Sequence, residues 1–381
     1  MLFTPTQTMP DLWHYLKAAS DAGRPIVLYG MGNGADKILA VCTRFGIEVK
    51  DFFASDGFVR GHTFHGKVVL TFDEVSTRYG EGNLIVLLSF ATSRPDVLTL
   101  IDRVAARCEL YAPDVPVCGD QLFDAAFYAM HRAQISRARE LLADEASRRV
   151  FDGVINYKLS GRIDRLAATA SAVEDDYAAI LRAERFETVM DLGAYNGDSI
   201  RALRPHAPKL SRVVAMEPDK RNFRKLSEYA AHAAEDSPPL TVYPVSEGAW
   251  DKADVLYFDA SGNRNATVTP GGDAVLHELH GAAKRQVEVK VNTPDNVAAT
   301  FLGDIPVDFI KYDVEGAEHQ AILGSRALIE RDHPALLISA YHRSEDIFAL
   351  PLLLHFLAPT YRLYLRRAPG IPAWDINLYG V

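Results

Sequence analysis

The sequence has little cysteine, no excess of basic charge and no long apolar run. Its 3 cysteines form no CxxC pair, a pattern typical of reduced thiols rather than a disulfide-stabilised secreted protein. With 41 basic against 50 acidic side chains, the formal net charge is −9, which argues against nucleic acid as a partner. No apolar run approaches the ~20 residues of a membrane span, and no basic leader precedes an apolar stretch at the start. We therefore expect a cytoplasmic protein without a membrane span.

Ordinary globular cores are expected from a composition of 48% hydrophobic and 10% aromatic residues, and the 381 residues suggest more than one domain. Apolar strands alternate with amphipathic helices over residues 1–118, which predicts a small Rossmann-like α/β domain. Its expected strands and helices are PIVLYG, 35–45, 49–54, 67–71, 83–90, 95–106 and 108–113. Residues 119–183 have a helical period of apolar positions and are interpreted as a helical linker.

A second alternation fills residues 184–381 and predicts a larger, mostly parallel sheet of six or seven strands. The expected strands are TVMDLG, RVVAMEP, LTVYPV, VDFIKYD, ALLISAYH, YRLYLRR and INLYGV. An insert at 254–300 between the third and fourth of them has the alternation and glycines of an additional hairpin. The fold class is therefore α/β, with two sheets joined by helices.

A glycine-containing turn follows the first strand of the larger domain. Asp191 ends the strand, and Gly193 and Gly197 precede Asp198 at the expected start of a helix. Glycine permits a positive φ angle, and its missing side chain leaves room for a small molecule above the sheet. The two acidic residues would repel a pyrophosphate and suit a cationic ligand.

The second strand ends at Glu217, where a carboxylate in an open α/β sheet accepts hydrogen bonds from the two hydroxyls of a ribose. A ribose with a nearby cation fits S-adenosylmethionine. The order of strand, DxGxxxG turn, strand and terminal Glu is more specific than the glycine turn alone, which would otherwise be interpreted as a tight turn.

Several motifs together resemble the FkbM-type methyltransferases. They are DLGAYNGDS, VVAMEPD, VSEGAWD, FIKYDVEGAEHQAILG and ISAYHRSEDI. The resemblance implies a class I methyltransferase fold with a seven-stranded, mostly parallel sheet, S-adenosyl-L-methionine as cofactor, and transfer mainly to oxygen. Some members carry an N-terminal sheet domain and helical linker, so the resemblance extends over the whole chain.

Residue by residue, the resemblance implies that Asn196 joins Asp191, Gly193 and Gly197 in the cofactor loop. Glu217 matches the ribose acid, and Ser246 and Glu247 lie where the adenine is expected. Tyr195 departs from the small or polar residue expected at its position.

Methyl transfer to a hydroxyl requires a base that removes the proton as the bond forms. His342, just past the fifth strand, has an ordinary pKa near ~6.5 and suits this role. Asp313 or Glu315 would serve instead if burial raised its pKa, and Lys311 would orient Asp313 or a substrate oxygen. The alternative without a catalytic role is that these carboxylates complement a helix dipole, which suits Glu318 best.

Three alternatives stay open. The acids with His319 and His342 would also suit a divalent metal, although most of them have simpler uses, so a metal is left unknown. The GxGxxA pattern of Gly30, Gly32 and Ala35 would suit an NAD(P)-dependent oxidoreductase with Asp56 on the ribose, but close helix–sheet packing explains these glycines equally well. A non-catalytic nucleotide-binding scaffold is the third alternative.

The nature of the methyl acceptor comes from the resemblance alone. It implies O-methylation of a sugar, glycan or related hydroxylated metabolite, bound between His342, the DVEGAE turn and the insert. Residue spacing does not select among these acceptors, and a homo-oligomer is left open.

Overall fold

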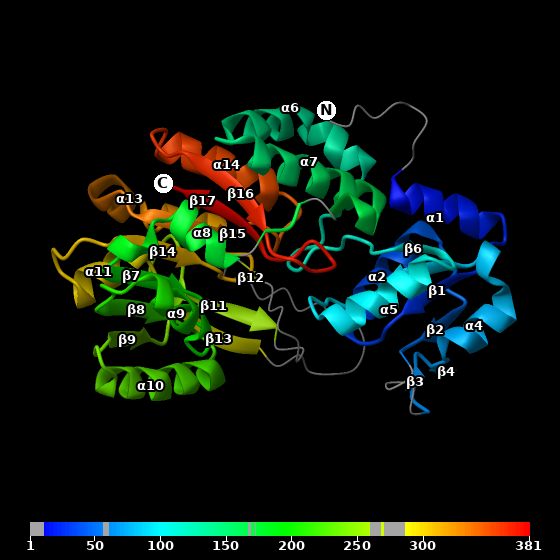
Figure 1. Cartoon of the computed structure of the whole chain (residues 1–381), viewed down its shortest axis with the longest axis horizontal. Coiled ribbons are helices and arrows are strands. Elements are labelled where there is room, and N and C mark those ends of the chain that lie inside the picture. The colour runs from blue at the N-terminus through cyan, green and yellow to red at the C-terminus, as the bar shows by residue number, and fades with distance from the viewer. Residues whose placement is uncertain (1–10, 56–60, 167–168, 172, 260–267, 270–285) are drawn as a thin grey trace.

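The structure is a computed structural model, described here for residues 11–55, 61–166, 169–171, 173–259, 268–269 and 286–381. Its two main sheets, one parallel and one mostly parallel, lie at opposite ends of the chain. Figure 1 shows helices α6 and α7 above and between these sheets. The chain is thus organised around two α/β units joined by helices.

The N-terminal sheet has four parallel strands in the order β2-β1-β5-β6. Its elements are α1 (Leu12–Asp21), β1 (Ile26–Tyr29), α2 (Asn33–Phe45), β2 (Asp51–Phe53), α4 (Phe72–Tyr79), β5 (Ile85–Leu88), α5 (Pro95–Ala105) and β6 (Glu109–Tyr111). Local signals explain the helix starts. Asp11 accepts a hydrogen bond from the His14 amide, and Thr71 forms a capping box with Glu74.

One expected strand of this unit, at 67–71, is not a member of the main sheet. Instead, β3 (Thr63–Phe64) and β4 (Lys67–Val68) form a separate antiparallel hairpin. Gly66, with a φ of 75°, lies in the turn between them. Only Leu70 reaches the sheet, through a single bridge to Phe53. The apolar pattern of this short segment was compatible with either pairing, and the tight turn decided it.

The connecting helices are α6 (Ala125–Leu141), α7 (Glu145–Ser160) and α8 (Val173–Ala179). Asp124 and Asp144 cap the first two by accepting hydrogen bonds from the amides of Phe127 and Ser147. Side chains of α6 and α7 belong to one apolar core that runs from the N-terminal sheet to the C-terminal sheet. The connector is therefore packed into both units.

Seven strands form the C-terminal sheet, in the order β16-β17-β15-β14-β7-β8-β9. Their bounds are β7 (Thr188–Leu192), β8 (Arg212–Met216), β9 (Thr241–Val245), β14 (Phe309–Tyr312), β15 (Ala335–Ser339), β16 (Leu363–Arg367) and β17 (Ile376–Gly380). All neighbouring strands pair in parallel except β17, which is antiparallel to both β15 and β16. The predicted seven-stranded, mostly parallel sheet is confirmed.

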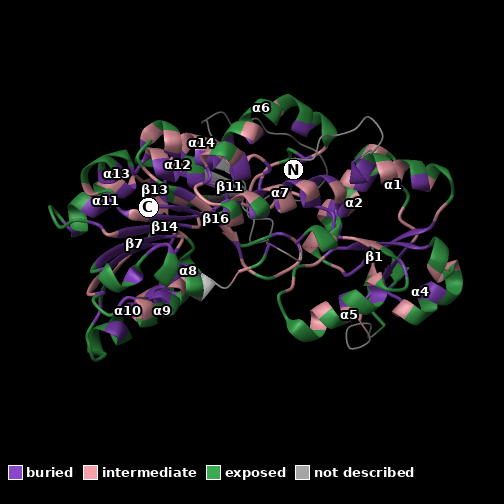
Figure 2. Cartoon of the chain, turned by 45° about the horizontal axis from the view of Figure 1, so that its top comes forward, coloured by how far each residue is buried: buried purple, intermediate pink, exposed green. Residues whose placement is uncertain are grey.

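Helices cover both faces of this sheet, because the strands are apolar on both sides. The helices of this unit are α9 (Asp198–Leu203), α10 (Lys220–Glu235), α11 (Pro294–Phe301), α12 (Glu318–Leu323), α13 (Arg326–Asp332) and α14 (Asp346–Leu357). Residues of α9 and α10 pack in one core cluster, and residues of α11 to α14 pack in the other. In Figure 2 the central strands β7 and β14 are buried and the outward faces of the helices are exposed.

The predicted hairpin in the insert is present. Strand β11 (Asp254–Asp259) pairs antiparallel with β13 (Gln286–Asn292), and β10 (Gly248–Ala249) and β12 (Val268–Thr269) complete a small sheet. The rest of the insert, 260–267 and 270–285, lies outside the described residues.

No helix among the described residues has both the length and the apolar character that crossing a bilayer requires.

A buried ion pair joins the end of the N-terminal unit to the connector. Lys158 Nζ lies 2.9 Å from Asp114 Oδ2, and the two side chains are 4% and 7% exposed. Replacing Lys158 with Met should lower the free energy of unfolding by about 3–5 kcal/mol, because Asp114 is left buried without its cation. The exposed pair of Arg162 and Asp164 provides the control, since Arg162→Met should cost less than about 1 kcal/mol. Denaturant unfolding measures both, and equal losses would contradict the prediction.

Candidate active site

The carboxyl ends of β7, β8, β14 and β15 meet at one edge of the C-terminal sheet. In an open parallel sheet this edge is where ligands bind. The glycine turn follows β7, Glu217 follows β8, Asp313 follows β14 and His342 follows β15. The fold therefore brings the expected cofactor loop and the expected catalytic residues to the same side of the sheet.

The two glycines of the loop both adopt a positive φ, 84° at Gly193 and 82° at Gly197. The space beside them is filled by protein. A Cβ on Gly193 would lie 1.9 Å from the Asp313 carbonyl oxygen, and one on Gly197 would lie 2.5 Å from the Tyr229 ring. The expectation that these missing side chains leave room for a ligand is thus wrong at both positions. The glycines instead allow the loop to pack against β14 and α10.

Glu217 connects this loop to the end of β8. Its side chain is 7% exposed, and its carboxylate accepts hydrogen bonds from the amides of Tyr195 and Asp219, both at 2.8 Å. Burial raises the pKa of Glu217 to about 7, against the lowering effect of these two amides. The carboxylate fixes the loop and retains lone pairs for a further donor.

Asp191 is 2% exposed, and neither of its carboxylate oxygens has a hydrogen-bond partner among the described residues. The register of β7 and β14 places it opposite Lys311, whose Nζ lies 3.9 Å from Asp191 Oδ1. Both residues line a cavity of about 10 Å³ together with Ser199. Burial raises the pKa of Asp191 to about 6, because the nearby lysine compensates the desolvation only in part.

The other residues expected at the cofactor lie around the same edge. Asn196 accepts a hydrogen bond from Arg201 through its side-chain oxygen, at 2.7 Å. Asp198 begins α9 and is exposed. Ser246 is exposed just after β9, and Glu247 accepts a hydrogen bond from Asn292 of β13 at 3.0 Å. The insert sheet therefore borders the region expected for the adenine.

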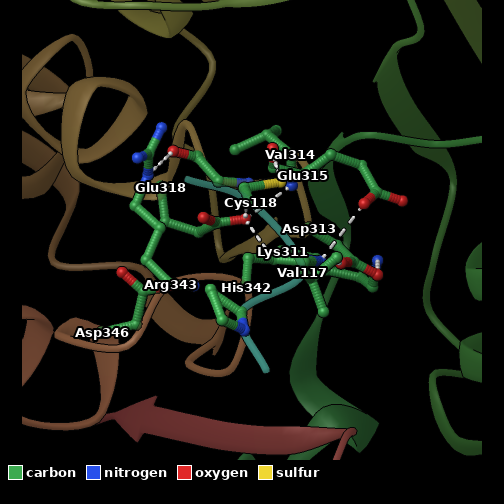
Figure 3. A network of polar contacts seen from close by, with 12 residues as sticks. Val117, Cys118, Lys311, Asp313, Val314, Glu315, Glu318, His342, Arg343 and Asp346 are labelled. Carbon is green, nitrogen blue, oxygen red and sulfur yellow. Dashed lines mark hydrogen bonds and ion pairs between the residues drawn. The ribbon is translucent and has the colours of Figure 1, made fainter. Parts of the chain in front are cut away.

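His342 is the centre of a buried polar network (Figure 3). The ring is 1% exposed, and its Nδ1 donates to Glu318 Oε1 at 2.9 Å. The other ring nitrogen, Nε2, faces Asp313 Oδ1 at 3.7 Å and Glu315 Oε2 at 3.6 Å. The ring is thus oriented from one side by a carboxylate and presents Nε2 on the other side to two more.

Lysine and histidine offset the negative charge of this network. Lys311 Nζ donates to Asp313 Oδ2 at 3.0 Å. Although burial acts in the opposite direction, Lys311 and His342 hold the pKa of Asp313 below its usual value. Burial alone would lower the pKa of His342, but Glu318, Asp313 and Glu315 together raise it to about 9.

From the sequence, Glu318 was interpreted either as an acid that complements a helix dipole or as a member of the functional carboxylate group, and the structure gives it a specific task. It begins α12, is 1% exposed, and accepts hydrogen bonds from the amides of Val314 and Gly316 as well as from His342. The signal available in the sequence was the DVEGAE string itself, which places a second glutamate just past the turn.

Asp313, Glu318 and His342 each offer an atom within 4.8 Å of the other two, a spacing that a divalent cation would accept. Some of their atoms already have partners, whereas Glu318 Oε2 is buried without a hydrogen-bond partner among the described residues. Asp313 accepts from Lys311, and Glu318 accepts from His342 and from two amides of the turn. His319, which the sequence also suggested, is exposed and outside this group. The metal is therefore left unknown, as it was from the sequence.

Two further acids near this network were not singled out from the sequence. Asp346, at the start of α14, is buried, and burial together with the charge of Glu318 raises its pKa. Asp375, just before β17, lies within electrostatic reach of Asp313, His342 and Lys311. The antiparallel return of β17 beside β15 brings Asp375 to this edge, a placement that no local pattern signals.

The glycine loop of the N-terminal unit is explained mainly by packing. A Cβ on Gly30 would lie 2.6 Å from the Phe90 ring, and one on Gly34 would lie 2.1 Å from the Ser89 carbonyl oxygen. Gly32, by contrast, has no atom within 4 Å of its Cβ position and requires glycine for its φ of 88°. Asp56, expected at a ribose, lies outside the described residues.

The seven-stranded sheet, with its reversed final strand and its polar carboxyl edge, defines a Rossmann-like methyltransferase fold. Residues 191–368 match the family model described as the methyltransferase FkbM domain. Residues 191–368 are therefore a methyltransferase FkbM domain.

Among solved structures, the chain is similar to the methyltransferase FkbM from Methylobacillus flagellatus KT, with 19% identity, a TM-score of 0.71, and coverage of 98% of this chain and 94% of that one. Precorrin-6y C5,15-methyltransferase from Geobacter metallireducens GS-15 has 10% identity, covers 54% and 87% of the two chains, and has a TM-score of 0.32.

Fibrillarin from Aeropyrum pernix, solved with natively bound S-adenosyl-L-methionine, has 13% identity, covers 52% and 68% of the two chains, and also has a TM-score of 0.32. Scores this low carry no further conclusion. No curated protein matches the chain.

The buried carboxylate of Asp191, which Lys311 compensates only in part, should make the folded protein less stable than a neutral side chain at this position would. An acid with a raised folded-state pKa costs folding free energy once it ionises, so the cost of Asp191 is complete above about pH 6 and vanishes below about pH 4. Asp191→Asn should therefore raise the free energy of unfolding by about 1 kcal/mol near pH 8 and have little effect near pH 4. Asp198→Asn, an exposed acid on the same loop, is the control. A loss of stability in Asp191→Asn near pH 8 would refute the prediction.

Proposed function

We propose that the chain is an S-adenosyl-L-methionine-dependent methyltransferase that methylates a hydroxyl oxygen of a sugar, glycan or related hydroxylated metabolite. The observation that carries this proposal is the position of His342. A buried carboxylate orients its ring, and Nε2 faces the sheet edge that also holds the glycine turn and Glu217. A positioned base at the sheet edge where a nucleoside cofactor is expected is what oxygen methylation requires.

The residues present fit this cofactor. Asp191 is a buried carboxylate without a hydrogen-bond partner among the described residues, and a cationic group nearby would compensate it. Glu217 has lone pairs left for the ribose hydroxyls. Asn196, Gly193, Gly197 and Asp198 would bind the amino-acid part, and Ser246 and Glu247 the adenine. When bound, S-adenosyl-L-methionine supplies a methyl group already activated by a positive sulfur.

On the acceptor side, His342 removes the hydroxyl proton through Nε2. Glu318 holds the ring in place through Nδ1 and stabilises the positive charge that the ring gains. Asp313 and Glu315 accept hydrogen bonds from the acceptor, and Lys311 keeps Asp313 ionised.

The charge around His342 supports a neutral acceptor. Asp313 and Glu315 face Nε2 directly, and Asp375 lies within electrostatic reach. Carboxylates repel a phosphorylated or carboxylated acceptor and accept hydrogen bonds from neighbouring hydroxyls. A polyhydroxylated acceptor without charge fits this arrangement best.

Three further proposals complete this interpretation. We divide the chain into a Rossmann-like accessory domain at 1–118, a helical linker at 119–183 and the methyltransferase domain at 184–381. We place the protein in the cytoplasm, in keeping with its few cysteines. An NAD(P)-dependent oxidoreductase is not favoured, because close packing against neighbouring residues explains most of the N-terminal glycines.

The cofactor assignment predicts that S-adenosylmethionine and S-adenosylhomocysteine bind to the intact chain and that NAD does not. Asp191→Asn should weaken S-adenosylmethionine binding about tenfold or more, because it removes the buried anion that faces the cation. Isothermal titration calorimetry with the three ligands measures this. Saturable NAD binding with no binding of either sulfur nucleoside would overturn the cofactor assignment.

The base assignment predicts that His342→Gln lowers kcat by about 10²- to 10⁴-fold, while the affinity for S-adenosylhomocysteine changes less than about twofold. Only the neutral imidazole accepts a proton, so wild-type activity should rise with pH toward the His342 pKa of about 9 and level off above it. The positive charge of bound cofactor should lower the pH of this plateau. His319→Gln, an exposed histidine on the adjoining helix, is the control. Unchanged turnover in His342→Gln would reject the assignment.

A further inference from the structure

The segment that leaves the N-terminal unit runs against the turn that carries Glu315. Its backbone and side chains contact this turn and the residues just past β15 at several points. The Cys118 amide donates to the His342 carbonyl at 2.8 Å, and the Ser344 hydroxyl donates to the Gln121 carbonyl at 2.5 Å. In Figure 3 the sulfur of Cys118 lies beside the turn, within the network around His342.

The Cys118 side chain contacts the turn at its most constrained residue. Its Sγ lies 3.0 Å from the Glu315 carbonyl oxygen, with the thiol as donor. Glu315 has a φ of 52°, a left-handed conformation that costs free energy in a residue other than glycine and persists only when the surroundings hold it. Cys118 is buried, and burial raises the pKa of its thiol to about 12, so the proton that it donates is retained.

The next residue of the turn fits around the same cysteine. Gly316 has a φ of 91°, and a Cβ there would lie 2.9 Å from Cys118 Cβ and 3.1 Å from its sulfur. The Gly316 carbonyl accepts a hydrogen bond from Arg343 Nε at 2.8 Å. Two successive carbonyls of the turn thus accept hydrogen bonds from residues outside it. Cys118 donates to the Glu315 carbonyl, and Arg343 donates to the Gly316 carbonyl.

We propose that Cys118 is a positioning residue of the acceptor site. Its thiol holds the Glu315 carbonyl and its amide holds the His342 carbonyl, so a single residue at the end of the N-terminal unit keeps the Glu315 carboxylate and the His342 ring facing each other at 3.6 Å. The inference rests on the proposed function only in taking these two residues as the acceptor side. On this proposal, the segment that leaves the N-terminal unit is a structural part of the active site.

The experiment compares Cys118→Ala, which removes the thiol donor, with Cys118→Ser, which keeps a donor at nearly the same place. Cys108→Ala is the matched control, because Cys108 is also buried but directly precedes β6 of the N-terminal sheet. Glu315→Gln gives the effect of losing the carboxylate itself.

The first readout needs no turnover. The His342 ring signals are titrated by NMR and assigned by their absence in His342→Gln. Because the Glu315 carboxylate raises the pKa of His342, Cys118→Ala should lower this pKa by at least half of the shift that Glu315→Gln produces. Cys118→Ser and Cys108→Ala should titrate like the wild type. A wild-type titration in Cys118→Ala would overturn the proposal, whatever the activity of the protein proves to be.

The second readout is methyl transfer. Cys118→Ala should lower kcat about tenfold with the KM for S-adenosylmethionine unchanged within about twofold, and Cys118→Ser should restore most of the loss. In a Glu315→Gln background, Cys118→Ala should have little further effect, because the two changes act through the same carboxylate. An equal loss of kcat in Cys108→Ala, or independent effects of Cys118→Ala and Glu315→Gln, would contradict the proposal. Absence of methyl transfer in the wild type would count against the proposed function alone, since the titration still reports on the positioning.

Discussion

The hydrogen bond between His342 and Glu318 is the contact on which the site depends. Both side chains are 1% exposed and lie 2.9 Å apart, so neither can rely on water to satisfy its charge or its hydrogen bonds. The same Glu318 oxygen accepts the amides of Val314 and Gly316, which shape the turn carrying Glu315. A single buried carboxylate therefore fixes the ring and the turn in front of it. The position of Nε2 relative to Asp313 and Glu315 follows from this contact.

The charges of the edge are the second constraint. Burial raises the pKa of both Asp191 and Glu217. The folded protein is therefore less stable when these two acids are ionised than when they are neutral. Such an arrangement costs folding free energy and is typical of sites that have a function to perform. A cationic nucleoside would compensate the cost, whereas a diphosphate would add to it. The same reasoning, applied around His342, favours a neutral hydroxylated acceptor.

The sequence predicted the elements well because their signals are local. All seven strands of the larger sheet are short apolar runs, and the glycine turn and Glu217 directly follow two of them. What it could not predict are contacts between distant residues. The Asp313 carbonyl beside Gly193, the Tyr229 ring beside Gly197 and the approach of Cys118 to Glu315 all arise from packing between separate elements. The positive φ expected for this glycine turn is present at Gly193 and Gly197, whereas the close contacts that also require glycine there come from the tertiary structure.

The central claim is that the carboxyl edge of the seven-stranded sheet binds a cationic sulfur nucleoside. A crystal structure of the intact chain grown with S-adenosyl-L-methionine tests this claim most directly. The account predicts the ribose hydroxyls within hydrogen-bond distance of Glu217 and the sulfur on the side of the edge that holds Asp313 and His342. Density for phosphate oxygens on the 193–198 loop, or a nucleoside bound only at the N-terminal glycine loop, would contradict it.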